Sequence, residues 1–276
     1  MAVCSVCKKR PAVYYRRFSG DRLCMPCLRK QLLKAVKKSL GAPGLLKPRQ
    51  VVGVLISPIA PLHSIALADL VYRVEKSYGS TIKILHMDNV ELSEDTQRLV
   101  SRLGEVIRVE APRVKEAGLV ECMRLDRGLA GAAARMHGVN AVILPYTRSH
   151  LAMAGLEALL GEWWYWSEAL DRWSGLVPMI AGLSSIEAEA ASAYSFLIGA
   201  DAISLCRVNL AAGRLFKRVA SNRPELVYSS SKTIDLLAGA SGRRGTICRI
   251  CGGYSSAQVC SVCSRYGLDR LVGRSG

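Results

Sequence analysis

Eight of the ten cysteines stand in pairs whose spacing is typical of a metal site. The first set is Cys4, Cys7, Cys24 and Cys27, and the second is Cys248, Cys251, Cys260 and Cys263. Two Cys-x-x-Cys pairs joined by a short hairpin make a tetrahedral four-thiolate site, so we predict two structural zinc ions. The alternatives are disulfides or a redox motif, but the redox motif needs a thioredoxin-like βαβ context that the flanking sequence lacks.

Two cysteines, Cys122 and Cys206, remain outside these sets. A lone cysteine is most often a small buried apolar side chain, and this is one interpretation of each. The other is that the two form a reactive pair or the remnant of a metal site. Together with Asp88, which follows a predicted strand, they are the candidate catalytic residues.

A strand–turn–helix unit over residues 51–78 opens the central part of the chain. Many α/β proteins hold a nucleotide phosphate at such a turn. The residues of this turn are Ser57, Pro58, Ile59, Ala60 and Pro61. They include no glycine, lysine or acid, and proline removes an N–H donor. From the sequence we therefore expect no ATP at this turn.

Strands and helices alternate through the rest of the central region. Strands are predicted over 51–56, 81–87, 105–109 and 140–144, and helices over 61–78, 94–103, 117–137, 148–160, 184–198 and 231–238. The helix at 184 is predicted from a capping box made by Ser184 and Glu187. The alternation indicates a parallel sheet covered on both faces, with ligands beyond the carboxyl ends of its strands.

Positive charge is concentrated at the two ends of the chain. The net charge is +16: residues 1–49 hold 13 Lys and Arg against one acid, and residues 243–276 hold six against one. Residues 50–242 hold 19 against 20 acids. The three ranges are also the predicted domains: a zinc module with a basic helix, an α/β domain and a zinc knuckle. Clustered positive charge favours a polyanion as partner, and solubility alone is the other explanation.

A basic helix predicted over residues 28–40 follows the first cysteine set. Its lysines and arginines either cover apolar surface with their stems or track phosphates, and we favour the second interpretation. The predicted RNA contacts are Lys8, Lys9, Arg10, Arg16, Arg17, Arg29, Lys30, Lys34, Lys37, Lys38, Arg243, Arg244 and Arg249. Trp163, Trp164, Tyr165, Trp166 and Trp173 form a separate aromatic cluster, for which core packing or a subunit interface is favoured over base stacking.

Half of the residues are hydrophobic, which indicates a globular chain. No apolar run reaches the roughly 18–20 residues of a membrane span, and the first ten residues lack the apolar core of a signal peptide. We therefore expect a cytoplasmic protein with no membrane contact. Asn and Gln occur four times each, a mild thermophile signal.

These features resemble the TtuA-type tRNA 2-thiolation enzymes over almost the whole chain. The resemblance lies in AVYYRRFSGDRLCMPC at residues 12–27 and CRICGGYSSAQVCSVC at residues 248–263. It implies a nucleotide α-hydrolase (PP-loop ATPase) domain of the α/β class between two zinc modules. The family's Ser-Gly-Gly-Lys-Asp-Ser loop is replaced here by residues 57–62, and its acid-rich segment after the fourth strand by residues 145–150.

The family also binds an iron–sulfur cluster through three central cysteines. Cys122 and Cys206 match the second and third of these, and Leu119 stands at the first, so two thiolates make a cluster unexpected. Asp88 matches an acid that the family keeps.

The leading hypothesis is an RNA-binding, catalytically degenerate relative that contacts tRNA or ribosomal RNA. Such a chain would serve as a non-catalytic subunit, as a homodimer or beside an active relative. The alternatives are an active ATP-dependent tRNA sulfurtransferase with a divergent site and a protein–protein adaptor.

Overall fold

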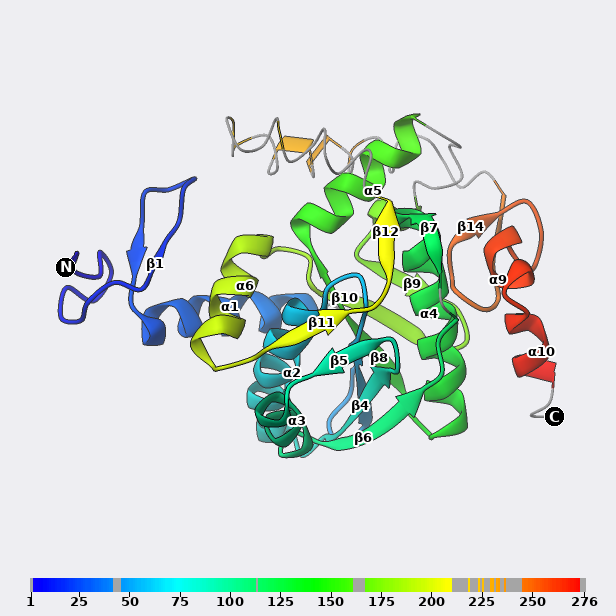
Figure 1. The fold of residues 1–276 in the computed structure, drawn as a ribbon, viewed down its shortest axis with the longest axis horizontal. Coiled ribbons are helices and arrows are strands. Elements are labelled where there is room, and N and C mark those ends of the chain that lie inside the picture. The colour runs from blue at the N-terminus through cyan, green and yellow to red at the C-terminus, as the bar shows by residue number, and fades with distance from the viewer. Residues whose placement is uncertain are drawn as a thin grey trace.

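A six-stranded sheet forms the centre of the protein in the computed structural model, which describes residues 2–41, 46–112, 114–160, 167–209 and 245–273 and isolated positions between 218 and 236. The cysteine modules at the two ends of the chain lie on opposite sides of this sheet (Figure 1). The predictions for Trp163, Trp164, Tyr165, Trp166, Arg243 and Arg244, and most of the helix at 231–238, lie outside the described residues.

The strands follow the order β6-β4-β3-β8-β10-β9. They are β3 (Val51–Ile56), β4 (Thr81–Met87), β6 (Glu105–Val109), β8 (Ala141–Thr147), β9 (Arg172–Ser174) and β10 (Pro178–Leu183). Every pairing is parallel except that of β9 with β10 at one edge. All seven residues of β8 are buried, as expected of a strand covered on both faces.

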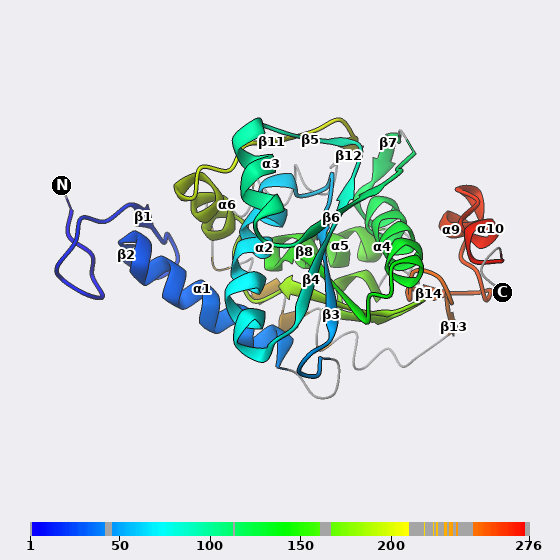
Figure 2. The same ribbon diagram turned by 90° about the horizontal axis from the view of Figure 1, so that it is seen from below.

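Helices cover both faces of the sheet. Figure 2 shows α2 (Pro61–Glu75) and α3 (Glu94–Ser101) on one side of β3, β4 and β6, and α4 (Leu119–Met136) on the other. The short helix η1 (Lys76–Tyr78) continues α2, while α5 (Arg148–Leu160) and α6 (Ala188–Leu197) follow β8 and β10. The predicted α/β class with a mostly parallel sheet is therefore confirmed.

Three predicted strands have the predicted bounds, and the fourth extends to Thr147. The capping box is wrong: α6 begins at Ala188 with Glu187 as its N-cap, because the Ser184 amide turns back to the Ala181 carbonyl. Strand β10 was not predicted. The helix expected at 117 begins at Leu119, since the residues before it pair as β7 (Lys115–Gly118) with β12 (Arg207–Asn209).

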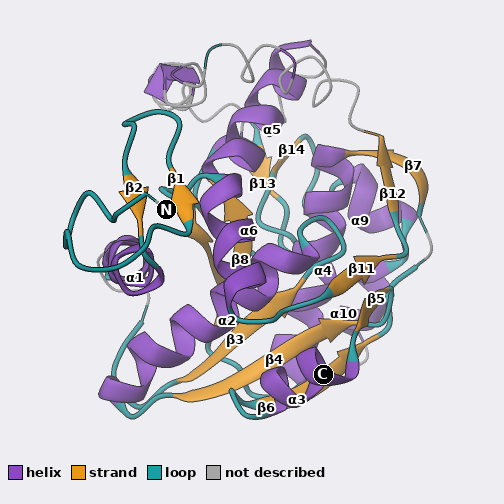
Figure 3. Cartoon of the chain, turned by 60° about the vertical axis from the view of Figure 1, so that its left-hand side comes forward, coloured by secondary structure: helices purple, strands orange, loops and turns teal. Residues whose placement is uncertain are grey.

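The N-terminal module is a hairpin of β1 (Tyr14–Tyr15) and β2 (Arg22–Leu23) followed by α1 (Met25–Leu40). Helix α1 begins three residues before its predicted start, with proline in its first turn. Its buried stripe is Leu28, Leu32, Val36 and Leu40. Figure 3 shows the hairpin and α1 beside α2 and α6.

The C-terminal module contains β13 (Thr246–Ile247), β14 (Tyr254–Ser255), α9 (Ser261–Arg265) and α10 (Leu268–Gly273). A further short sheet pairs β5 (Val90–Leu92) with β11 (Ala202–Ser204). Within the described ranges, no helix combines the length and the apolar character that crossing a bilayer requires. The domain boundaries at 49/50 and 242/243 stay predictions.

Candidate functional site

Both cysteine sets come together as the sequence predicted. In each set the four sulfur atoms lie within 4.8 Å of one another. The Sγ atoms of Cys7 and Cys24 are 3.7 Å apart, and those of Cys251 and Cys260 are also 3.7 Å apart. A tetrahedral ion with four sulfurs at about 2.3 Å separates them by about 3.8 Å. Each module therefore has the dimensions of a four-sulfur metal site.

The two modules share a turn after their first cysteine pair, but with a different residue in it. The Lys8 amide donates to the Cys4 carbonyl at 2.9 Å, and the Gly252 amide donates to the Cys248 carbonyl at 2.9 Å. Gly252 has a φ of +73° and Lys8 a φ of +53°. Glycine adopts this left-handed conformation readily, whereas a residue with a Cβ loses roughly 1–2 kcal/mol. The strained residue of the N-terminal turn is thus an exposed lysine.

Exposed cations cover the N-terminal module and α1. Those that were predicted as RNA contacts are Lys8, Lys9, Arg10, Arg17, Lys30, Lys34, Lys37 and Lys38, and none forms an ion pair with another residue that the structure describes. Two other predicted RNA contacts bond within the protein instead: Arg16 inside the module, and Arg29 to α6. Arg16 donates to Gln31 Oε1 at 2.7 Å and pairs with Asp21, while Arg29 donates to the Tyr194 hydroxyl at 3.1 Å. Arg249, on the C-terminal module, is exposed.

Buried charges attach the C-terminal module to α4. Arg127 is fully buried, donates to the Cys251 carbonyl at 2.8 Å and lies 2.5 Å from a Glu168 oxygen. Arg124 donates to the other Glu168 oxygen at 2.9 Å and to the Tyr254 carbonyl at 2.8 Å. Burial alone would raise the pKa of Glu168, but the two arginines hold it below its usual value. Neither arginine nor Glu168 was singled out in the sequence.

The turn after β3 has its polar groups bonded within the protein. The Ser57 hydroxyl donates to the Asp126 carboxylate on α4, and the Ser57 amide donates to Ser64 Oγ at 3.0 Å. The Ile59 amide donates back to Ser57 Oγ at 3.1 Å. Burial raises the pKa of Asp126 to about 7, although the Ser57 hydroxyl and Arg127 oppose this shift.

The two remaining thiols lie close enough for their charges to influence each other. Cys122 is buried one helical turn before Asp126, and Cys206 joins β11 to β12 and accepts a hydrogen bond from Asn89 Nδ2 at 3.0 Å. Burial raises the pKa of Cys122, and the charges of Asp126 and Cys206 raise it further. The pKa of Cys206 is also raised by burial. Asp88 is exposed and accepts from the Ala111 amide at 3.0 Å.

Two histidines that were not singled out in the sequence face each other after strands β3 and β8. His63 in the first turn of α2 and His150 in the first turn of α5 have ring centroids 5.4 Å apart. Burial lowers the pKa of His63 to about 4 and that of His150 to about 3, so both rings are neutral at pH 7.

Asp126 was also missed in the sequence. The signal that could have found it was its spacing of four residues from Cys122, since this spacing puts both side chains on one face of a helix.

Fold and modules together define a class: a PP-loop-like α/β sheet between two four-cysteine modules. No model of a known protein family matches the sequence, and no curated protein matches it. Among solved structures, the chain is similar to the U34-tRNA thiolase NcsA from Methanococcus maripaludis, with a TM-score of 0.71 and 17% identity over 98% of this chain and 96% of that one. A likeness to the NH3-dependent NAD synthetase from Campylobacter jejuni has a TM-score of 0.38 and 14% identity over 79% and 96% of the two chains, and carries no argument.

The chain thus has the fold of a tRNA thiolase, modules included. The prediction that ATP and an iron–sulfur cluster are absent is wrong, because the thiolase with this fold is described with its 4Fe–4S cluster and the PP-loop fold is one that uses ATP. That prediction rested on single residues that differ from the family's motifs, at positions 57–62 and at Leu119. Among the described residues, ligation of a cluster by thiolates outside the two cysteine modules would fall to Cys122 and Cys206.

Proposed function

We propose that this protein binds tRNA through its N-terminal module and α1, as a relative of the tRNA thiolases. The observation that carries the proposal is the set of eight exposed cations without an ion pair among the described residues. Lys8 adds to it, because a lysine with a left-handed φ stands where the C-terminal module has glycine. The shared fold favours tRNA over ribosomal RNA. A tRNA partner would place the protein in the cytoplasm.

We propose zinc as the ion of both modules. Four thiolates in a tetrahedral arrangement suit zinc, and closed sites of this kind are structural. Zinc on four thiolates carries a net charge of about −2, so residues 1–49 stay strongly basic. The bound ion would fix the hairpin and the turn that present Lys8 and its neighbours.

We also propose that the chain does not thiolate tRNA by itself and that it acts as an RNA-binding subunit, paired with itself or with an active relative. The buried Cys122 thiol supports this, since burial raises its pKa and the thiolate is the reactive form of a cysteine. The competing function is a tRNA sulfurtransferase that uses Cys122 and Cys206. Incubation of the chain, loaded with zinc and reconstituted anaerobically with iron and sulfide, with tRNA, ATP and sulfide, followed by mass spectrometry of the nucleosides, decides between them. Thiouridine formed by wild type and lost in Cys122→Ala would overturn the non-catalytic role.

Filter binding of tRNA across a salt series tests the RNA-binding proposal. The variant Lys34→Gln/Lys38→Gln removes two exposed charges from α1, and Arg102→Gln/Arg135→Gln removes two from the α/β domain as a matched control. Phosphate contacts release counterions, so each lost contact should reduce the slope of log K against log salt by about 0.7–0.9. We expect a reduced slope in the first variant and an unchanged slope in the control.

A further inference from the structure

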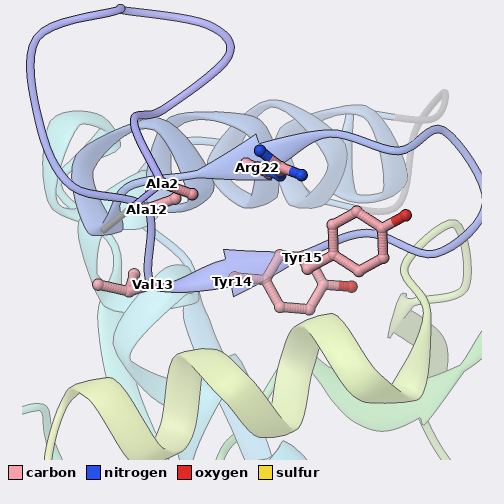
Figure 4. A pocket seen from close by; sticks show the side chains of 6 residues that line it. All are labelled: Ala2, Ala12, Val13, Tyr14, Tyr15 and Arg22. Carbon is pink, nitrogen blue, oxygen red and sulfur yellow. The ribbon is translucent and has the colours of Figure 1, made fainter.

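A hollow of about 390 Å³ lies on the N-terminal hairpin, within the range of about 300–1,000 Å³ usual for ligand pockets. Its lining residues are Ala2, Ala12, Val13, Tyr14, Tyr15 and Arg22. Figure 4 shows Tyr14 and Tyr15 on one strand of the hairpin and Arg22 on the other. The zinc-binding cysteines and the cation set do not include these side chains, so the hollow has no role assigned so far.

The lining combines the groups that stack on a nucleobase. Tyr15 and Arg22 are direct partners across the antiparallel pair, so their side chains lie on the same face of the hairpin. Tyr15 is 55% exposed and Val13 is 49% exposed. Aromatic rings and arginine planes are the surfaces on which unpaired bases stack.

The hairpin is held firmly while Tyr15 stays exposed. Tyr14 packs against the main hydrophobic core, and Leu23, opposite it on β2, is fully buried. The neighbouring Val13 amide donates to the Leu23 carbonyl at 2.9 Å. One face of the hairpin is therefore anchored, and the other presents a ring and a guanidinium group to solvent.

Charge selects the occupant of the hollow. Asp21 is the single acid among residues 1–49, and Arg16 and the Ser19 hydroxyl already contact it. Arg22 forms no ion pair with any residue that the structure describes. An apolar hollow within such a basic surface fits a ligand that joins a flat apolar group to an anion, as a nucleotide in a single strand does.

We propose that this hollow, the Tyr15 pocket, binds one unpaired base of the RNA, with the ring of Tyr15 and the guanidinium of Arg22 as its stacking surfaces. The proposal rests on the proposed tRNA binding and adds a base contact to the phosphate contacts of α1. Stacking tolerates every base, so the pocket would act on loops and ends of an RNA rather than on its paired stems.

Alanine and phenylalanine at position 15 test the pocket. Stacking on an aromatic residue is worth roughly 5- to 150-fold in affinity per base, so Tyr15→Ala should weaken tRNA binding by such a factor. Tyr15→Phe should bind as wild type does. Tyr78→Ala removes another half-exposed tyrosine, 50% exposed, from outside the module and serves as the matched control. Zinc content and circular dichroism show that each variant is folded.

The variant Tyr15→Trp gives a direct optical signal. A single-stranded oligonucleotide should quench the added indole fluorescence, measured against wild type, and heparin should not, because it offers charge without bases. If wild type fails to bind tRNA at all, the proposed function itself is wrong. If wild type binds while Tyr15→Ala keeps its full affinity, or if the oligonucleotide leaves the indole signal unchanged, the pocket is refuted and the phosphate contacts stand.

Discussion

Replacing Glu168 by glutamine should destabilise the protein more than any surface substitution. Glu168 gives one carboxylate oxygen to Arg124 at 2.9 Å and the other to Arg127 at 2.5 Å, and all three side chains are buried. Glutamine has nearly the same shape but supplies one acceptor and one donor. One guanidinium group would therefore face an N–H group, and two buried positive charges would lose their counter-charge.

The expected loss follows from the cost of breaking a buried ion pair, about 3–5 kcal/mol of unfolding free energy. Urea unfolding of the zinc-loaded protein, followed by circular dichroism, measures it. Glu94→Gln is the matched control, since Glu94 pairs with Arg98 at 3.1 Å on the exposed face of α3. That pair is worth about 0.3–0.5 kcal/mol. A Glu168→Gln protein within about 1 kcal/mol of wild type would refute the view that these charges fasten the C-terminal module.

Three further predictions concern other parts of the protein. Lys8→Gly should keep the unfolding free energy or raise it by up to roughly 1 kcal/mol, because glycine adopts the left-handed φ of this position without strain. The same variant should bind tRNA more weakly, because it removes an exposed positive charge. A lower unfolding free energy in urea would contradict the first expectation. Asp126 should contribute a loss of stability as pH rises from 3.8 to about 7, because folded Asp126 holds a proton that the unfolded chain releases, while His63 and His150, whose pKa values are lowered, act in the opposite sense; the urea-derived stability of Asp126→Asn should therefore rise more steeply with pH over this range than that of wild type, and parallel profiles would count against the raised pKa of Asp126. Cys7→Ser and Cys251→Ser should each lower the zinc content, measured by metal analysis, from two to one per chain. Only Cys251→Ser should also destabilise the α/β domain, since the Cys251 carbonyl accepts from buried Arg127; equal unfolding curves for the two variants would argue against that link.

The central strands could be predicted from the sequence because each is an apolar run bounded by turn residues. Strand β3 ends at the Ser57-Pro58 turn and β4 begins after Gly79, so their bounds match those observed. Strand β10 was missed, since it begins at a proline, a residue type that is depleted in strands. The start of α6 was misplaced because Ser184 bonds within its own turn, which local pattern does not reveal.

The cysteine modules could be predicted because their ligands are close in sequence. The side chains at the edge of the sheet could not be predicted, because they come from distant segments of the sequence. Ser57 and Asp126 form a hydrogen bond across 69 residues, and Asn89 and Cys206 form one across 117. The error about ATP and the cluster has the same origin. A residue that departs from a family motif concerns one position in the sequence. What the edge of the sheet can bind depends on all the side chains that the fold brings together there.

The salt dependence of tRNA binding tests most directly the claim that the N-terminal module and α1 bind tRNA. Eight exposed cations on the N-terminal module and α1, of which about half or more contact phosphates, predict a slope of log K against log salt between about −3 and −7. The Lys34→Gln/Lys38→Gln variant should then show a slope shallower by about 1.4–1.8. Weak binding with a slope near zero, equal in wild type and variant, would contradict the account.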